Sequence, residues 1–240
     1  MGVQVYCRML GYAVAITLHV GNMVYMALPR PKEVADHPGI KRFAEMQHRY
    51  LTCWTFFLQV VYAVTGLTCD ILTLQNSGNK NYKLPKYLKG FRDTLFAGVV
   101  FPSSVVVFSL FWPLFLYNRS LVFPDFLDLV LTPTSNHIMH TAILPIVLWE
   151  VLFQPRRKPR SHKRYLGHMI FHFVLYLAVL TYTYIEKGTW VYPIATKLYG
   201  TIYFPFLITS VLAVAFLSYY LQWFLSSLVH SELPDKSRKK

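Results

Sequence analysis

The sequence predicts an all-α membrane protein, a single polytopic bundle of six transmembrane helices. Composition is the first indication: 54% of the 240 residues are hydrophobic, and the mean hydropathy is +0.35. Such a chain is too apolar for an ordinary soluble domain. Its long apolar runs are the second indication, because each is close to the roughly 20 residues with which a helix crosses a ~30 Å hydrocarbon core. Clustering of the 24 Lys and Arg residues in short loops is the third.

The first predicted span follows Arg8 and has no small-residue cleavage site after it, so we interpret it as a retained helix. The segment 120–134, which contains Pro124 and Asp125, precedes the fourth span, and we place it at the membrane interface. The last span is long enough to tilt. All six belong to one domain, residues 1–240, which ends in a basic tail at 231–240. The predicted spans cover residues 9–28, 51–74, 94–116, 135–153, 165–186 and 198–228.

Polar residues interrupt the second span in a regular pattern. Steps of three and four residues place them on one helical face. That face is expected to point into the bundle, because lipid offers no hydrogen-bond partners. Interhelical hydrogen bonding is the ordinary role of such residues. The residues are Thr52, Thr55, Gln59, Tyr62 and Gly66.

The third span contains Phe101-Pro102-Ser103-Ser104, which we expect to break the helix in mid-span. Broken helices are typical of transporters.

Orientation follows from the basic residues. Most of them lie at the amino terminus, in the 75–93 and 154–164 loops and in the tail, and the positive-inside rule then places both termini in the cytosol. The protein is expected in the endoplasmic reticulum or the plasma membrane. Its net charge of +13 favours anionic membrane lipids as partners. Nucleic acid is not an expected partner, because the charge is divided among short loops.

Two histidines open the fourth span, where an ionisable side chain suggests a functional site. His137 and His140 are three residues apart and lie on about the same helical face. A transition metal normally needs three or four convergent ligands. The second pair, His168 and His172, is expected near the other end of the bundle. We therefore predict no metal and no cofactor, and the pattern alone is typical of packed, hydrogen-bonded histidines.

Four blocks of sequence stand out between about residues 50 and 200. They are Phe91-Arg92-Asp93, the run from Phe111 through Tyr117-Asn118-Arg119, Asn136-His137 with His140-Thr141, Pro145 and Glu150, and Gly188-Thr189-Trp190-Val191-Tyr192-Pro193. In composition and in order, these blocks resemble those of the family of androgen-induced and androgen-dependent TFPI-regulating proteins.

The resemblance implies a six-helix membrane hydrolase that cleaves fatty acid esters of hydroxy fatty acids with a threonine nucleophile and a histidine. The threonine motif matches Arg49-Tyr50-Leu51-Thr52, and the histidine that follows the motif's asparagine is His137. The second and fourth spans both begin on the non-cytosolic side, so Thr52 and His137 are expected to meet. A threonine hydroxyl needs a base, and imidazole, with a pKa near 6.5, suits that role.

Supporting residues are expected around this pair. Asn136, Asp128 or Glu186 is expected to orient His137. Arg119 and Tyr192 are candidates for binding the substrate's carboxylate, although such residues at span ends are usually interfacial anchors. His140 is expected to have a structural role.

Two other classes of function stay open at this level. One is a histidine-dependent membrane metalloenzyme, and the other is a non-enzymatic transporter or receptor adaptor. The sequence determines neither the acyl length of the substrate nor the oligomeric state.

Overall fold

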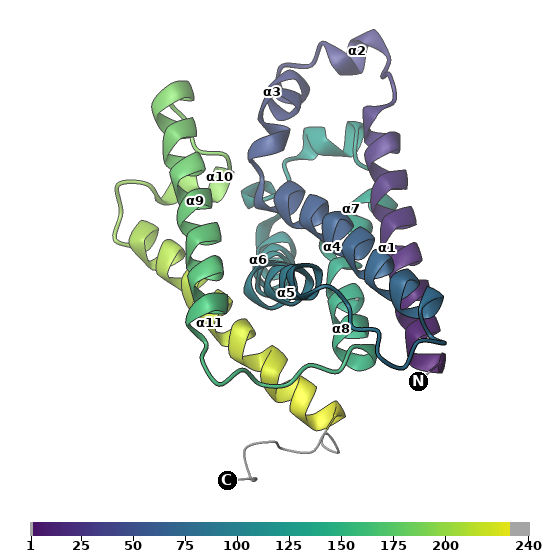
Figure 1. Ribbon diagram of the computed structural model, residues 1–240. Coiled ribbons are helices and arrows are strands. Elements are labelled where there is room, and N and C mark those ends of the chain that lie inside the picture. The colour runs from purple at the N-terminus through teal and green to yellow at the C-terminus, as the bar shows by residue number, and fades with distance from the viewer. Residues whose placement is uncertain (1, 231–240) are drawn as a thin grey trace.

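A computed structural model describes residues 2–230, and over that range the chain forms helices and no strands (Figure 1). The predicted tail at 231–240 lies outside the described residues. The long helices are α1 (Gly2–Ala27), α4 (Leu51–Gln75), α5 (Lys86–Leu95) with α6 (Phe101–Asn118), α7 (Pro133–His140) with α8 (Ile143–Phe153), α9 (Lys163–Lys187) and α11 (Tyr203–Val229). Short helices are α2 (Lys32–Ala35), α3 (Pro38–Met46) and α10 (Pro193–Leu198), with 3-10 turns at Gln47–Arg49, Arg119–Leu121 and Asp125–Leu129.

Six helical segments are long and apolar enough to cross a membrane, which confirms the predicted all-α, six-span architecture. Two of them extend beyond the apolar runs. The first begins at Gly2 rather than residue 9, and the third begins at Lys86 rather than residue 94. Backbone hydrogen bonding does not require apolar side chains, so both helices continue into polar sequence. In the first, the Arg8 side chain turns inward and pairs with Asp70 of α4.

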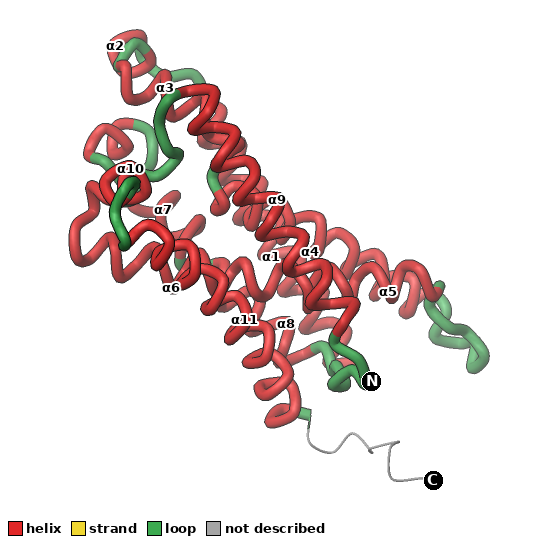
Figure 2. Tube along the Cα trace, turned by 90° about the vertical axis from the view of Figure 1, so that its left-hand side faces the viewer, coloured by secondary structure: helices red, strands yellow, loops and turns green. Residues whose placement is uncertain are grey.

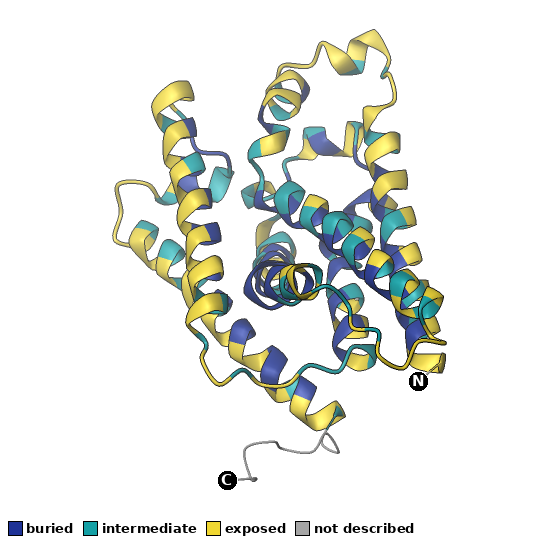
Figure 3. Ribbon diagram, in the orientation of Figure 1, coloured by how far each residue is buried: buried dark blue, intermediate teal, exposed yellow. Residues whose placement is uncertain are grey.

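The segments run alternately between two ends of the bundle. The start of α1, the end of α11 and α5 lie toward one end, which we call the terminal end; α2, α3 and α10 lie at the other, the distal end (Figures 1 and 2). Helices α9 and α11 meet only near the terminal end, where the rings of Tyr165 and Trp223 are 5.7 Å apart. Toward the distal end they diverge (Figure 1). Their outer faces are exposed (Figure 3), as expected of helices that face lipid.

The third span contains no break at Pro102, contrary to the prediction. Residues Phe96–Val100 form one π-helical turn, and the helix continues from there into α6. Pro102 has no N–H to donate to the carbonyl of Ala97, which it would bond in the π register. Instead, the Nε2 group of Gln222 on α11 donates to this carbonyl over 2.8 Å. A side chain from a neighbouring helix therefore replaces the missing bond, and the segment stays continuous.

The polar face of α4 points into the bundle as predicted. Gln59 is buried at its centre, where its Nε2 donates to Ser104 Oγ over 2.8 Å and to the carbonyl of Ile143 over 2.9 Å. Its Oε1 lies 2.6 Å from Nε2 of His19. One glutamine thus joins α1, α4, α6 and α8, which confirms that part of the stripe serves interhelical bonding.

Candidate active site

The side chains of Thr52 and His140 meet inside the distal half of the bundle. Thr52 lies in the first turn of α4, which begins at Leu51, and His140 is the last residue of α7. Thr52 Oγ1 and His140 Nε2 are 3.3 Å apart. Both side chains are buried. The first turn of α4 and the last residue of α7 therefore place a hydroxyl beside an imidazole.

The other nitrogen of His140 is held by the residue one turn earlier. Nδ1 lies 2.8 Å from Asn136 Oδ1 and 3.1 Å from the carbonyl oxygen of Asn136. A backbone carbonyl can only accept a hydrogen bond, so Nδ1 carries the proton in the neutral ring. Nε2 is then unprotonated and accepts the hydrogen bond from the Thr52 hydroxyl. This is the arrangement of a hydroxyl nucleophile with its general base.

Aromatic residues of α6 fix the plane of the imidazole. The ring of Phe111 stacks on that of His140 with centroids 3.5 Å apart and planes 7° apart. The indole Nε1 of Trp112 donates to the carbonyl of His140 over 3.2 Å. The ring and the backbone of His140 are therefore both held against α6.

The prediction that His137 meets Thr52 is wrong. His137 is exposed, its Nδ1 lies 3.0 Å from Thr141 Oγ1, and its ring packs on Trp112. Residues three apart on a helix differ in direction by about 60°, and residues four apart by about 40°. The inward face of α7 contains Asn136 and His140, so His137 is turned away. Of the residues named from sequence, Asn136 takes the expected orienting position, but toward His140.

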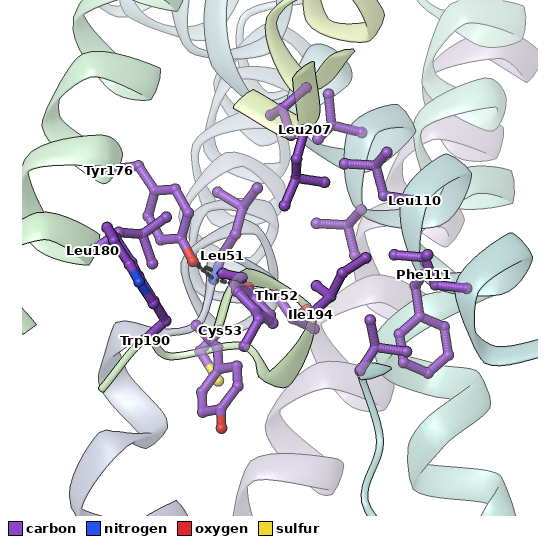
Figure 4. A pocket seen from close by; sticks show the side chains of 18 of the residues that line it. Leu51, Thr52, Cys53, Leu110, Phe111, Tyr176, Leu180, Trp190, Ile194 and Leu207 are labelled. Carbon is purple, nitrogen blue, oxygen red and sulfur yellow. Dashed lines mark hydrogen bonds between the residues drawn. The ribbon is translucent and has the colours of Figure 1, made fainter. Parts of the chain in front are cut away.

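Thr52 and His140 both line an apolar cavity of about 200 Å³. Figure 4 shows this cavity, with Thr52 among the labelled residues of its lining. Its walls come from α6, α9, α10 and α11, as represented by Leu110, Leu180, Ile194 and Leu207. Val174, Leu177 and Leu212 line the cavity and are also exposed at the surface. The cavity therefore reaches the outside between α9 and α11, where the two helices diverge.

Two tyrosines hold the beginning of α4. The backbone N–H of Leu51 donates to Tyr176 Oη over 2.9 Å and to Tyr192 Oη over 3.0 Å, and the two hydroxyls are 3.0 Å apart (Figure 4). Burial raises the pKa of Tyr192 well above its usual value, so its hydroxyl stays neutral. Tyr192 was a candidate from sequence, and it lines the cavity. Tyr176 had no distinguishing sequence signal, because its role depends on where α9 packs.

Three of the residues predicted to support the site lie elsewhere. Glu186 pairs with Arg49, with 2.6 Å between Oε2 and Nη2, and Arg119 pairs with Asp128 over 2.6 Å. None of the three lines the cavity beside Thr52. Glu186 and Asp128 therefore do not orient a histidine of the site, since their carboxylates are engaged by arginines nearer to them. Arg119 also lies over the rings of Phe115 and Phe123, as an interfacial anchor does.

The described residues contain no group of three or more His, Cys, Asp or Glu side chains arranged to hold a metal ion. His172, of the second pair, contacts Ser103 over 3.1 Å, far along the chain from the first pair. The donor set that a histidine-dependent metalloenzyme requires is therefore not found in residues 2–230.

Comparison with known proteins gives consistent matches. The family model described as FAR-17a/AIG1-like protein matches residues 12–227. The human androgen-dependent TFPI-regulating protein is 41% identical over 151 residues, which are 62% of this chain and 63% of that protein. Its rat counterpart is 36% identical over 169 residues, 70% of this chain and 71% of that protein. The human androgen-induced gene 1 protein is 29% identical over 148 residues, 60% and 62% of the two chains.

The match thus spans less than two thirds of the length of these two human relatives. No solved structure matches the chain.

Proposed function

The chain belongs to the FAR-17a/AIG1-like protein family, and we propose on that premise that it is a membrane-embedded hydrolase of lipid esters. The proposed substrates are fatty acid esters of hydroxy fatty acids. Thr52 is the nucleophile and His140 is the general base. The observation that carries this proposal is the hydrogen bonding of His140, whose Nδ1 faces the carbonyl of Asn136 while Nε2 faces the Thr52 hydroxyl.

The first half of the reaction transfers the acyl group. Thr52 Oγ attacks the ester carbonyl carbon as Nε2 of His140 takes the hydroxyl proton. The tetrahedral intermediate then collapses, the bond to the alkoxy oxygen breaks, and His140 returns the proton to the departing hydroxy fatty acid. The products of this half are the alcohol and an acyl ester of Thr52.

Water completes the cycle. His140 takes a proton from water, the resulting hydroxide attacks the acyl ester, and Thr52 leaves with the proton that His140 gives back. Both tetrahedral intermediates carry a negative oxygen. The start of α4 supports this charge through the positive end of the helix dipole, which lies at Thr52. The Leu51 N–H is bonded to two tyrosine hydroxyls and the Cys53 and Trp54 N–H groups to the Tyr50 carbonyl, so the dipole rather than these donors is the contribution of α4.

The cavity suits the proposed substrate. It begins at Thr52 and His140, its walls are apolar, and it reaches the surface between α9 and α11. A hydrocarbon chain that arrives from the bilayer gains little free energy from the hydrophobic effect, because lipid is already apolar. Recognition must therefore come from the shape of the cavity and from the polar groups near its inner end.

We place the distal end, with the active site, on the non-cytosolic side and both termini in the cytosol. The basic loops before α5 and before α9 support this orientation through the positive-inside rule. The membrane is that of the endoplasmic reticulum or the plasma membrane.

The test uses the purified full chain in detergent with a panel of fatty acid esters of hydroxy fatty acids. The wild type should release free fatty acid, and Thr52→Ala and His140→Gln should each release almost none. His137→Gln is the matched control on the same helix and should keep most activity. An acyl group detected on the Thr52 peptide by mass spectrometry would support the covalent step. Full activity in Thr52→Ala would overturn the mechanism.

A further inference from the structure

A second hollow lies on the other side of the Thr52–His140 pair. We call it the α1–α4 groove; its volume is about 650 Å³. Its lining includes Met23 and Met26 of α1, Trp54 and Phe57 of α4, and Gln47 and His48 of the turn that joins α3 to α4. The groove is mostly apolar, with polar side chains at one end. Neither the reaction above nor the comparisons give it a role.

The groove and the apolar cavity are separated by two residues that line both of them, Cys53 and Met139. These are the immediate neighbours of the reacting pair, since Cys53 follows Thr52 and Met139 precedes His140. The reacting atoms therefore lie at the boundary between the two hollows. Met139 is unbranched with three rotatable side-chain bonds, so this boundary can open without movement of the backbone.

Any ester has two arms, which diverge at the carbonyl. We propose that the cavity binds the acyl arm and that the α1–α4 groove binds the alkoxy arm, so that the site accepts an ester with a long hydrocarbon on each side. This inference rests on the proposed hydrolase function. It assigns a second binding site for a hydrocarbon chain that ends in a polar group.

The lining residues of the two hollows differ in polarity, and this difference indicates which arm of the ester each hollow binds. The cavity is apolar along its walls, which suits the plain acyl chain that stays on Thr52. The groove ends at Gln47 and His48, whose amide and imidazole N–H groups can donate to a carboxylate. The leaving hydroxy fatty acid carries such a carboxylate. The exposed position of His48 also gives this product a route to water.

Two variants block one hollow each, and each has a matched control. Ala44 lines the groove and is exposed, so Ala44→Trp fills the groove from its surface; Ala35→Trp is the control, because Ala35 is exposed on α2 and lines neither hollow. Leu212→Trp narrows the cavity from its outer side. Leu217→Trp is its control on the outer face of α11.

Two crossed substrates separate the arms: methyl palmitate has a long acyl arm, and hexadecyl acetate has a long alkoxy arm. Ala44→Trp should lower kcat/KM for hexadecyl acetate by roughly tenfold or more and leave methyl palmitate nearly unchanged. Leu212→Trp should do the opposite, and both controls should behave as wild type. Equal losses on both substrates, or the reversed pattern, would overturn the assignment. Thermal unfolding of each variant checks that the fold is retained.

If the protein is not a hydrolase, the result is different: the wild type hydrolyses neither these two esters nor a fatty acid ester of a hydroxy fatty acid. The groove is then tested by photocrosslinking a diazirine-bearing long-chain hydroxy fatty acid to the wild type. Labelled peptides that contain Met23 or Trp54, and their loss in Ala44→Trp but not in Ala35→Trp, would support a chain in the groove. Absence of that labelling would overturn it.

Discussion

The rings of Phe111 and His140 lie face to face, with centroids 3.5 Å and planes 7° apart. Phe111 comes from α6 and His140 from α7, so the stack joins two helices at the reacting pair. The stack holds the plane of the imidazole, and within that plane Nε2 faces Thr52 and Nδ1 faces Asn136. A base that is already aligned does not have to reorient during the reaction.

Removing the stack should therefore affect turnover. We expect Phe111→Leu to lower kcat for ester hydrolysis while the protein still folds, because leucine keeps an apolar side chain but offers no flat face. Phe111→Ala should also destabilise the fold, by about 3–5 kcal/mol, through loss of buried contacts. Steady-state kinetics and thermal unfolding of the two variants check this. An unchanged kcat in Phe111→Leu would show that the stack does not position the base.

Asn136 should act on the rate through His140 rather than by binding substrate. Asn136→Ala removes the Oδ1 acceptor at 2.8 Å but keeps the backbone carbonyl at 3.1 Å, so the preferred tautomer is weakened and not lost. We expect kcat to fall by about tenfold to a hundredfold, with little change in KM, because the base is weakened and not removed; loss of a general base costs roughly a hundredfold or more. Asn136→Asp keeps an acceptor and should recover much of the rate. A rise in KM alone would instead indicate a role in substrate binding.

The nucleophile and base should behave as one unit. Thr52→Ala and His140→Gln should each remove nearly all activity, and the double variant should be no worse than either single variant. His137→Gln should be mild, because its ring faces Trp112 and Thr141 rather than Thr52. Kinetics of the four proteins form a double-mutant cycle with a control. Losses that add in the double variant would mean that the two residues act in separate steps.

A buried ion pair at the terminal end should matter for stability and not for catalysis. Arg8 donates to both carboxylate oxygens of Asp70, over 2.8 Å and 2.7 Å. Asp70→Asn leaves the Arg8 charge buried without a matching anion, which costs about 3–5 kcal/mol. Asp36→Asn breaks an exposed pair with Lys41 and should cost about 0–1 kcal/mol. Thermal unfolding in detergent measures both, and equal effects would contradict the burial argument.

Stability should also decrease at high pH because of Tyr50, which precedes α4. Burial raises the pKa of its hydroxyl to about 12. In the unfolded chain a tyrosine ionises near pH 10. Between these values the folded state holds a proton that the unfolded state has lost, so the free energy of unfolding falls as pH rises. The unfolding temperature of Tyr50→Phe should therefore drop less between pH 9 and 11 than that of wild type, whereas the exposed control Tyr87→Phe should match wild type.

Patterns along the chain are enough to predict that the protein lies in a membrane, where its helices are, and which residue types form the site. Apolar runs of membrane length predict spans because lipid cannot satisfy an open backbone, and all six spans are present. The polar stripe on α4 and the short block from Asn136 to His140 marked the two helices that form the site. Local rules suffice for these features, since each depends on spacing along one helix.

Which histidine faces Thr52 depends on how the helices pack against one another. His137 and His140 are near in sequence and in direction, and their difference of about 60° matters only when a neighbour occupies one side of α7. That neighbour is α6, through Phe111, together with the first turn of α4. The same holds for Gln222, whose bond to the Ala97 carbonyl kept the third span continuous at Pro102. Contacts between distant segments depend on how helices pack, and spacing within one helix does not contain that information.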